Sequence, residues 1–370
     1  MSGAERRTRP KSTDEQFSLT AASLVDTSVP IEPASGREEE EEDEFETTDG
    51  IDVRSTGSAS ATSSIYAHTY ENGRRYQCFK NGRYPIPNDD SEQDREDMKH
   101  AMMLELTDGE LFYAPIGDHP QSILDIGTGT GELGLPGLSQ YEAQRPNVLN
   151  HVIKAGDRYP SARVRGIDLT PIQPTWVPPN VDFLIDDCEK DWLTEDCDLV
   201  HLRFMIIILR DVPTVLEHAF KSLRPGGWIE LQELCAEPLC DDNTMPDDDP
   251  VKYMYDLAGQ AFRKFGMDVT LPKRLEPLLH DAGFRNIHVV VKKVPIGVWA
   301  KNKTLRLIGL YQKMAILDLM PALAGRPFSA LGLSPEESQV TLAFARKGLD
   351  DYKTHRYFNY YFWYAQKPVS

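Results

Sequence analysis

The feature that most constrains the fold of this chain is a series of five short apolar runs separated by polar, helix-like segments. Each run is almost continuously apolar, as expected of strands buried on both faces, and the intervening segments suit crossover helices. The sequence therefore predicts a parallel sheet covered by helices on both faces. The expected strands are residues 122–127 (SILDIG), 162–169 (ARVRGIDL), 181–186 (VDFLID), 197–203 (CDLVHLR) and 225–234 (PGGWIELQEL).

A helix is expected before the first of these strands. Met98, Met102 and Leu106 recur at helical spacing with Met103 beside them, so a helix that begins near Glu92 has one apolar face. We expect this face to pack in the core.

The C-terminal third is also expected to be structured. Ser334 followed by Glu337 forms a capping box, which is typical of a helix start. The β-rich segments 287–296 and 355–368 are expected to pair as the last two strands at one sheet edge. The remaining helices are expected at residues 212–223, 251–265, 272–282 and 304–320.

The first strand ends in a glycine-rich turn, with Asp125 followed by Gly127, Gly129 and Gly131. Such a turn lets backbone N–H groups face a ligand, and glycine permits positive φ angles and close approach. The spacing is GxGxG, whereas the dinucleotide fingerprint is GxGxxG. An acid two residues before the first glycine suits a cationic or amino-bearing ligand better than a pyrophosphate, so we expect S-adenosylmethionine here. A tight strand-to-helix turn without a ligand is the alternative.

Acids also follow the next two strands. Asp168 ends the second strand, where a carboxylate can accept hydrogen bonds from ribose hydroxyls; a turn or N-cap aspartate is the alternative. After the third strand, Asp187 is expected to accept from an adenine amino group while the backbone N–H of Cys188 donates to the ring, with Asp186 as the alternative acid. Three acids after three successive strands meet at one sheet edge, which is more specific than any one of them alone.

In order along the chain, these motifs resemble the class I S-adenosylmethionine-dependent methyltransferases. The segments are LDIGTGTG, GDRYPSARVRGIDLTPIQPTWVPPNVDFLIDDCE, DLVHLRF and LRPGGWIELQE. More narrowly, PIQPTWVPPNV and ENGRRYQCFKNGRYPIPNDDSEQDRED resemble the fungal LaeA-like (TAM-domain) group, and the likeness covers residues 66–368. It implies an α/β, Rossmann-like fold: a mostly parallel seven-stranded sheet with helices on both faces and an antiparallel edge strand.

The resemblance also assigns roles to residues. It places Asp125 and the three glycines on the cofactor loop, Asp168 at the ribose and Asp187 at the adenine. His201 and Arg203 fall at the end of the fourth strand, which faces the reaction in this class. His201 is therefore the candidate base, with a partly buried histidine held by a backbone carbonyl as the alternative. Arg203 either orients an acidic acceptor or pairs with a neighbouring carboxylate, and no metal site is expected.

One segment departs from the family pattern. Gly131 and Asp168 are 37 residues apart, where similar folds need roughly 20. The intervening segment 132–149 contains Gly134, Pro136, Gly137 and Pro146, which are unfavourable in a helix interior. It is either an unusual insertion or a retained intron, of which the intron is slightly favoured.

Charge is concentrated near the N-terminus. Residues 1–60 hold 15 acids and 6 bases, a net charge of −9 and half of the −18 of the whole chain. Residues 1–62 are predicted to be a disordered acidic tail, either simply solvated or used for docking. Residues 63–370 are expected to form the methyltransferase domain, with a helical or lid segment at 63–115. Its aromatic and basic part, residues 66–84, either folds over the cofactor or packs on the sheet.

Composition also limits partners and location. An acidic surface lacks the basic patches that a phosphate backbone requires, so direct nucleic acid binding is not expected. The five cysteines form no CxxC pair, which indicates reduced thiols. The N-terminus has no apolar signal core and no run reaches ~18 apolar residues, so we expect a cytoplasmic or nuclear protein that is neither secreted nor membrane-bound. RRTRPK at residues 6–11 is either a nuclear address or a chance basic cluster.

Three functions fit these observations. The first is O- or N-methylation of an unidentified small molecule in secondary metabolism, with apolar helices at 251–265 and 304–320 lining the acceptor pocket. The second is a LaeA-like nuclear regulator that acts through protein partners. The third is an inactive binding module that keeps the cofactor fold.

Overall fold

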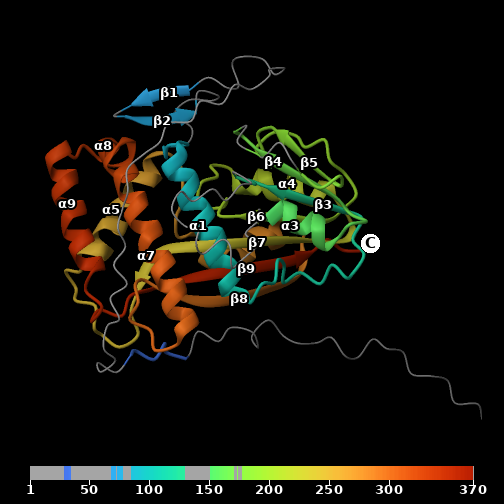
Figure 1. The fold of residues 1–370 in the computed structure, drawn as a ribbon. Coiled ribbons are helices and arrows are strands. Elements are labelled where there is room, and N and C mark those ends of the chain that lie inside the picture. The colour runs from blue at the N-terminus through green and yellow to red at the C-terminus, as the bar shows by residue number, and fades with distance from the viewer. Residues whose placement is uncertain are drawn as a thin grey trace, which may run out of the picture.

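A seven-stranded sheet forms the centre of the molecule (Figure 1), with the strand order β5-β4-β3-β6-β7-β9-β8. The computed structural model describes residues 29–34, 68–71, 73–77, 85–129, 151–170, 173 and 177–369. Neighbouring strands run parallel from β5 to β7, and β9 runs antiparallel to both β7 and the edge strand β8. The strands are β3 (Ser122–Ile126), β4 (Arg163–Asp168), β5 (Val181–Ile185), β6 (Cys197–Arg203), β7 (Leu223–Leu239), β8 (Arg285–Pro295) and β9 (Tyr357–Gln366). The predicted mostly parallel sheet, with its last two strands paired at one edge, is confirmed.

Helices cover both faces of the sheet because alternate side chains of a strand point to opposite sides. On β3, Ile123 packs with α3 (His151–Arg158), whereas Leu124 packs with α4 (Val212–Ser222) and α6 (Glu276–Asp281). The other helices gather beside one end of the sheet, on the left of Figure 1. They are α1 (Asp90–Leu106), α5 (Pro250–Lys264), α7 (Lys303–Ala324), α8 (Arg326–Leu331) and α9 (Pro335–Leu349).

Most helix predictions are confirmed, with one correction. The capping box at Ser334 and Glu337 is present at the start of α9. The single helix expected over 272–282 is instead a short 3-10 helix, η2 (Leu271–Arg274), followed by α6. Pro277 is the reason, because proline is tolerated in the first turn of a helix but not in its interior.

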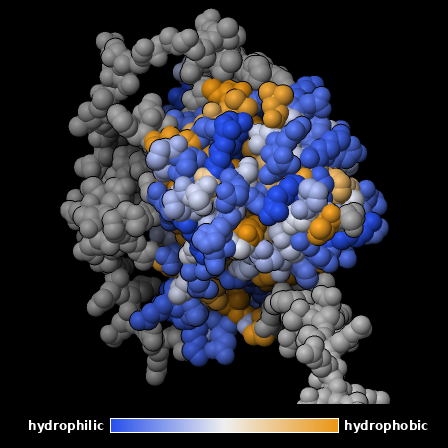
Figure 2. Space-filling view, turned by 90° about the vertical axis from the view of Figure 1, so that its right-hand side faces the viewer, coloured by the Kyte–Doolittle hydropathy of each residue, from blue (hydrophilic) through white to orange (hydrophobic). Residues whose placement is uncertain are grey.

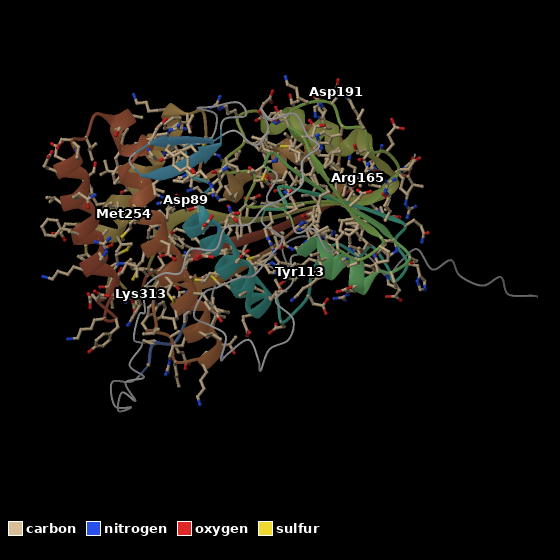
Figure 3. All side chains as sticks on the ribbon, turned by 45° about the horizontal axis from the view of Figure 1, so that its top comes forward. Asp89, Tyr113, Arg165, Asp191, Met254 and Lys313 are labelled. Atoms are coloured by element: carbon tan, nitrogen blue, oxygen red, sulfur yellow. The ribbon has the colours of Figure 1, made fainter. Side chains whose placement is uncertain are left out.

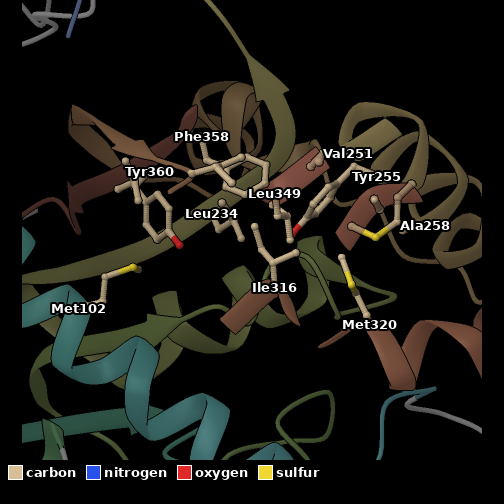
Figure 4. Packing of buried hydrophobic residues seen from close by; sticks show 14 of the residues in the cluster. Met102, Leu234, Val251, Tyr255, Ala258, Ile316, Met320, Leu349, Phe358 and Tyr360 are labelled. Carbon is tan, nitrogen blue, oxygen red and sulfur yellow. The ribbon is translucent and has the colours of Figure 1, made fainter. Parts of the chain in front are cut away.

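The helical layer has its own apolar core (Figure 4). Met102 and Met103 of α1 are almost fully buried there, together with Tyr255 of α5 and Phe358 and Tyr360 of β9. Burying each large side chain contributes roughly 1.5–3 kcal/mol. The predicted core packing of the methionine face is therefore confirmed, and it ties α1 to the C-terminal helices.

By length and composition, α7 is the one described helix that could cross a membrane. However, its apolar residues Ile308, Ile316, Met320 and Leu323 are buried in the core of the helical layer. The helix also contains a charged residue, Asp318, between Ile316 and Met320. These contacts are those of a core helix.

A short stretch of the predicted acidic tail, residues 29–34, contacts the C-terminal part of the chain. Within residues 29–34, Pro33 forms a β-bridge with Ala300, and the Ala34 N–H donates to the Trp299 carbonyl at 2.9 Å. Ile31 packs against the apolar cluster of Trp299, Ala300 and Tyr357. The overall acidic composition of residues 1–62 gives no sign of this apolar contact. The rest of residues 1–62 lies outside the described residues.

A small hairpin stands above the helical layer (Figure 1). Its strands are β1 (His68–Glu71) and β2 (Arg74–Gln77). Arg326 of α8 pairs with Glu71 and lies over the ring of Tyr76, 4.0 Å from its centroid. The described part of segment 66–84 thus packs on α8, and none of it lines the cavity described below.

Candidate functional site

A cavity of about 320 Å³ lies at the carboxyl ends of β3 to β6. One wall is the glycine turn with the residues that follow β4 and β5. The opposite wall is apolar and belongs mainly to α5 and α7, while α1 closes one side. The walls include Gly127, Gly129, Asp168, Asp187 and Cys188 on the sheet side, and Leu234, Tyr255, Ala258, Phe262, Leu319 and Leu323 on the apolar side.

The glycine turn is held tightly against β4. Gly127 and Gly129 have φ angles of 75° and 66°, the left-handed region that favours glycine. The Gly127 N–H donates to the Ile167 carbonyl at 2.7 Å. A Cβ on Gly127 would lie 2.1 Å from Sδ of Met205, so only glycine fits there without displacement.

Asp168 organises this turn as well as lining the cavity. Its carboxylate accepts hydrogen bonds from the backbone N–H groups of Gly129 and Thr170, both at 2.9 Å. Burial raises the pKa of Asp168, and these N–H groups oppose that shift. The Leu169 N–H is a third backbone donor to this carboxylate. A carboxylate has about four lone-pair sites, so three donors leave capacity for a hydroxyl group of a ligand.

The acids after β5 also reach the cavity. Asp186, Asp187 and Cys188 line it, and the Asp187 carboxylate accepts from the Glu189 N–H at 3.1 Å. Asp187 is buried, whereas Asp186 is more exposed. The choice of Asp187 over Asp186 for a ligand stays a prediction.

Asp125 and His201 do not line the cavity. They share the face of Ile123 and Leu199, two residues before them on their strands, and so point under α3. His201 Nδ1 lies 2.5 Å from Oδ1 of Asp125, and both side chains are buried. The structure thus places the His201 ring and the Asp125 carboxylate against each other and outside the walls of the cavity, where a base and a ligand-binding acid were predicted.

A second histidine completes this buried cluster. His151 at the start of α3 stacks on His201 with ring centroids 4.2 Å apart, and its Nε2 lies 3.2 Å from the Leu111 carbonyl oxygen. Ligand atoms of Asp125, His151 and His201 all lie within 4.8 Å of one another, a grouping that could hold a metal ion. However, the rings are nearly parallel, with 16° between their planes, so their in-plane lone pairs do not converge. The arrangement is a hydrogen-bonded cluster that supports the sheet under α3.

The cluster predicts an acid-sensitive stability. Burial and the neighbouring His151 lower the pKa of His201 to about 4, so the folded protein keeps it neutral. The unfolded chain takes up this proton near pH 6.5, and the free energy of unfolding should therefore fall as the pH drops from about 6.5 to 4, by about 3 kcal/mol. We expect urea unfolding of wild type and His201→Gln to diverge across this window, with the wild type losing more stability. A difference between the two proteins that is independent of pH would contradict this account.

Sequence reasoning missed the charged face of α1. Glu92, Arg95, Glu96 and Lys99 recur at helical spacing and all line the cavity. Figure 3 shows why: α1 runs from Asp89 across the molecule, between the helical layer and the sheet. A charged stripe usually marks a solvated helix face, so only its three- and four-residue spacing beside the methionine stripe could have drawn attention to it.

The segment after β6 completes this side of the site. Phe204 has a φ of 57°, which a non-glycine residue rarely adopts. Nζ of Lys99 lies over the Phe204 ring, 3.4 Å from the ring centroid. The next turn is held by Glu233, whose Oε1 accepts from the N–H groups of Met205 and Ile206 at 3.0 Å. Burial raises the pKa of Glu233 to about 8.

Two predicted features fall outside the described residues: Gly131 and segment 132–149. Arg203, which was predicted to orient an acceptor or to pair with a carboxylate, lines the cavity. Burial lowers the pKa of its guanidinium, and the negative charges of Asp125 and Glu96 oppose this shift.

A glycine turn after the first parallel strand, with acids after the next two, defines a class I, Rossmann-like methyltransferase. Comparison with known proteins agrees, because residues 96–289 match the model of a methyltransferase domain. The chain is 35% identical to the methyltransferase pytC of Aspergillus terreus, with 84% of this chain and 91% of the relative covered. It is 32% identical to the secondary metabolism regulator LAE1 of Cochliobolus heterostrophus (80% and 94% covered) and 31% identical to the protein-methionine methyltransferase laeA of Emericella nidulans (81% and 76% covered).

The chain therefore belongs to the fungal LaeA-like group of S-adenosylmethionine-dependent methyltransferases. Among solved structures, it is similar to a phosphoethanolamine N-methyltransferase of Haemonchus contortus in complex with S-adenosyl-L-methionine. That likeness has a TM-score of 0.38 and 17% identity, with 72% of this chain and 52% of the other covered.

Proposed function

We propose that this protein methylates a small, largely apolar molecule of secondary metabolism at an oxygen or nitrogen atom. The observation that carries the proposal is the continuity of the cavity. The glycine turn and the apolar wall of α5 and α7 line the same space, so a methyl donor on the sheet side and an acceptor on the helix side would meet.

The residues present fit S-adenosylmethionine. Gly127 and Gly129 line the cavity without side chains, so a ligand there meets the backbone of the turn, while Sδ of Met205 packs where a Cβ of Gly127 would be. The remaining acceptor capacity of the Asp168 carboxylate suits a ribose hydroxyl, Asp187 suits an adenine amino group, and the Cys188 N–H would donate to the ring. When bound, the cofactor supplies a methyl group on a sulfonium, which leaves by in-line displacement.

The remaining contribution of the chain is alignment and exclusion of water. Tyr255, Ala258 and Phe262 of α5 and Leu319 and Leu323 of α7 together line the helix side of the cavity. An apolar wall desolvates a ring or chain of the acceptor and holds it against the donor. The described apolar wall favours a small acceptor over a nucleic acid.

A second candidate is regulation through protein partners. It is favoured by relatives named secondary metabolism regulators, such as LAE1 of Cochliobolus heterostrophus. In that case we would place the protein in the nucleus; as a metabolic enzyme it would act in the cytoplasm. The surface in Figure 2 is mainly hydrophilic with small separate apolar patches, so this view offers no broad apolar docking face.

Metabolite profiles of a strain without the gene and its parent test the proposal. Loss of one methylated product with accumulation of its unmethylated precursor is expected for the enzyme. Silencing of many pathways would instead support the regulator. Absence of measurable S-adenosylmethionine binding by calorimetry would overturn both in favour of an inactive module.

A larger side chain in the apolar wall should block the acceptor specifically. Ala258 is buried and lines the cavity, so Ala258→Phe fills space on the acceptor side. A strain carrying this variant is expected to accumulate the same precursor as the deletion strain, while the purified variant keeps its S-adenosylmethionine affinity within about threefold. Gln260→Phe adds the same ring on the exposed side of α5 and should behave as wild type. Normal product from Ala258→Phe would place the acceptor elsewhere.

A further inference from the structure

Two charged side chains of α1, Glu96 and Lys99, line the cavity beside the glycine turn. Oε2 of Glu96 is 3.3 Å from the position that a Cβ on Gly129 would take, so this carboxylate lies directly against the turn. One helical turn further on, Lys99 is 7% exposed and also lines the cavity. A carboxylate and an ammonium group of α1 thus enter the cavity near the end of β3.

These two residues do not neutralise each other. Glu92 and Arg95, at the same three-residue spacing on the same helix, form a direct ion pair. In the described part of the chain no such pair joins Glu96 to Lys99, and no oxygen accepts a hydrogen bond from the Lys99 ammonium. Its described neighbour is the face of the Phe204 ring.

A buried ammonium with unused donors is unfavourable unless a partner arrives. The cation–π contact with Phe204 offsets only part of that cost. The unused N–H donors of Lys99 would therefore be satisfied by an anionic group in the cavity. The carboxylate of Glu96 would be satisfied by a cationic group. A zwitterion satisfies both.

We infer that Glu96 and Lys99 hold the amino-acid end of S-adenosylmethionine, Glu96 accepting hydrogen bonds from its ammonium and Lys99 donating to its carboxylate. The inference rests on the proposed function. It gives α1 the role first predicted for Asp125, whose carboxylate is turned toward His201.

Electrostatics of the site agree with this assignment. Burial and the nearby Glu92 carboxylate raise the pKa of Glu96, and burial with the nearby Arg95 lowers the pKa of Lys99. Each charged form is therefore disfavoured until an opposite charge is placed beside it. A ligand that brings both charges stabilises both side chains at once.

Two adenosyl thioethers separate this role from general cofactor binding. S-adenosylhomocysteine carries the amino-acid end, whereas 5′-methylthioadenosine lacks it and keeps the adenosine and sulfur. Calorimetry with the full chain is expected to show that Glu96→Gln and Lys99→Met each weaken S-adenosylhomocysteine binding about 10- to 100-fold. Their affinity for 5′-methylthioadenosine should stay within about twofold of wild type. Asp94→Asn, which removes an acid of the same helix outside the cavity walls, should change neither affinity.

The outcomes are distinct. A parallel loss for both ligands would show that α1 only supports the fold of the site, and unchanged S-adenosylhomocysteine binding would remove α1 from the cofactor site; either result overturns the inference. If the wild-type protein binds neither ligand, the proposed function itself fails and the inference falls with it. A selective loss in Lys99→Met carries the assignment even if Glu96→Gln does not fold.

Discussion

Gly127→Ala is expected to weaken S-adenosylmethionine binding by about 100-fold or more. The new Cβ would meet Sδ of Met205 at 2.1 Å, so either the Met205 side chain shifts within the cavity that it lines or the turn moves away from it; both change the glycine-turn side of the cavity. A displacement of about 1 Å at a binding site is enough for a loss of this size. Calorimetry with S-adenosylmethionine measures the effect directly.

Gly117→Ala is a matched control for this variant. Gly117 has the same φ of 75°, but a Cβ there would meet nothing within 4 Å. Both variants carry the cost of a left-handed alanine, about 1–2 kcal/mol of stability. Only Gly127→Ala should lose the cofactor; equal affinities in the two variants would show that the turn does not hold the ligand.

Asp249→Asn is expected to lower the free energy of unfolding by about 3–5 kcal/mol, because it leaves a buried guanidinium without its counter-charge. The Asp249 carboxylate binds Nε of Arg356 at 2.9–3.0 Å, and both residues are almost fully buried. Asp249 also caps α5, accepting from the Lys252 N–H at 2.8 Å, a bond that asparagine can still accept. The substitution therefore removes the negative charge beside Arg356 while it keeps the cap of α5.

Urea unfolding of Asp256→Asn provides the comparison. Asp256 lies on the same helix and pairs with Lys252, but both side chains are well exposed. Removing an exposed pair changes stability by about 0–1 kcal/mol. Similar losses in Asp249→Asn and Asp256→Asn would mean that the buried pair does not anchor α5, and with it the acceptor wall, to β9.

The sequence alone predicted what depends on local pattern. Apolar runs identified the strands, and Ser334 with Glu337 identified the start of α9, because strand burial and helix capping are decided by residues close together in the chain. Asp168 and Asp187 were placed at the cavity because residues that end successive parallel strands share one sheet edge.

Only the tertiary structure decided which side chains meet. Side-chain alternation on β3 and β6 turns Asp125 and His201 toward each other under α3, with the partner His151 coming from a distant segment. Likewise, Glu96 and Lys99 reach the cavity because α1 is anchored on α7 and crosses between the helical layer and the sheet. Helical spacing shows that two residues share a face, but the packing partner that this face meets is set by contacts between segments far apart in the chain.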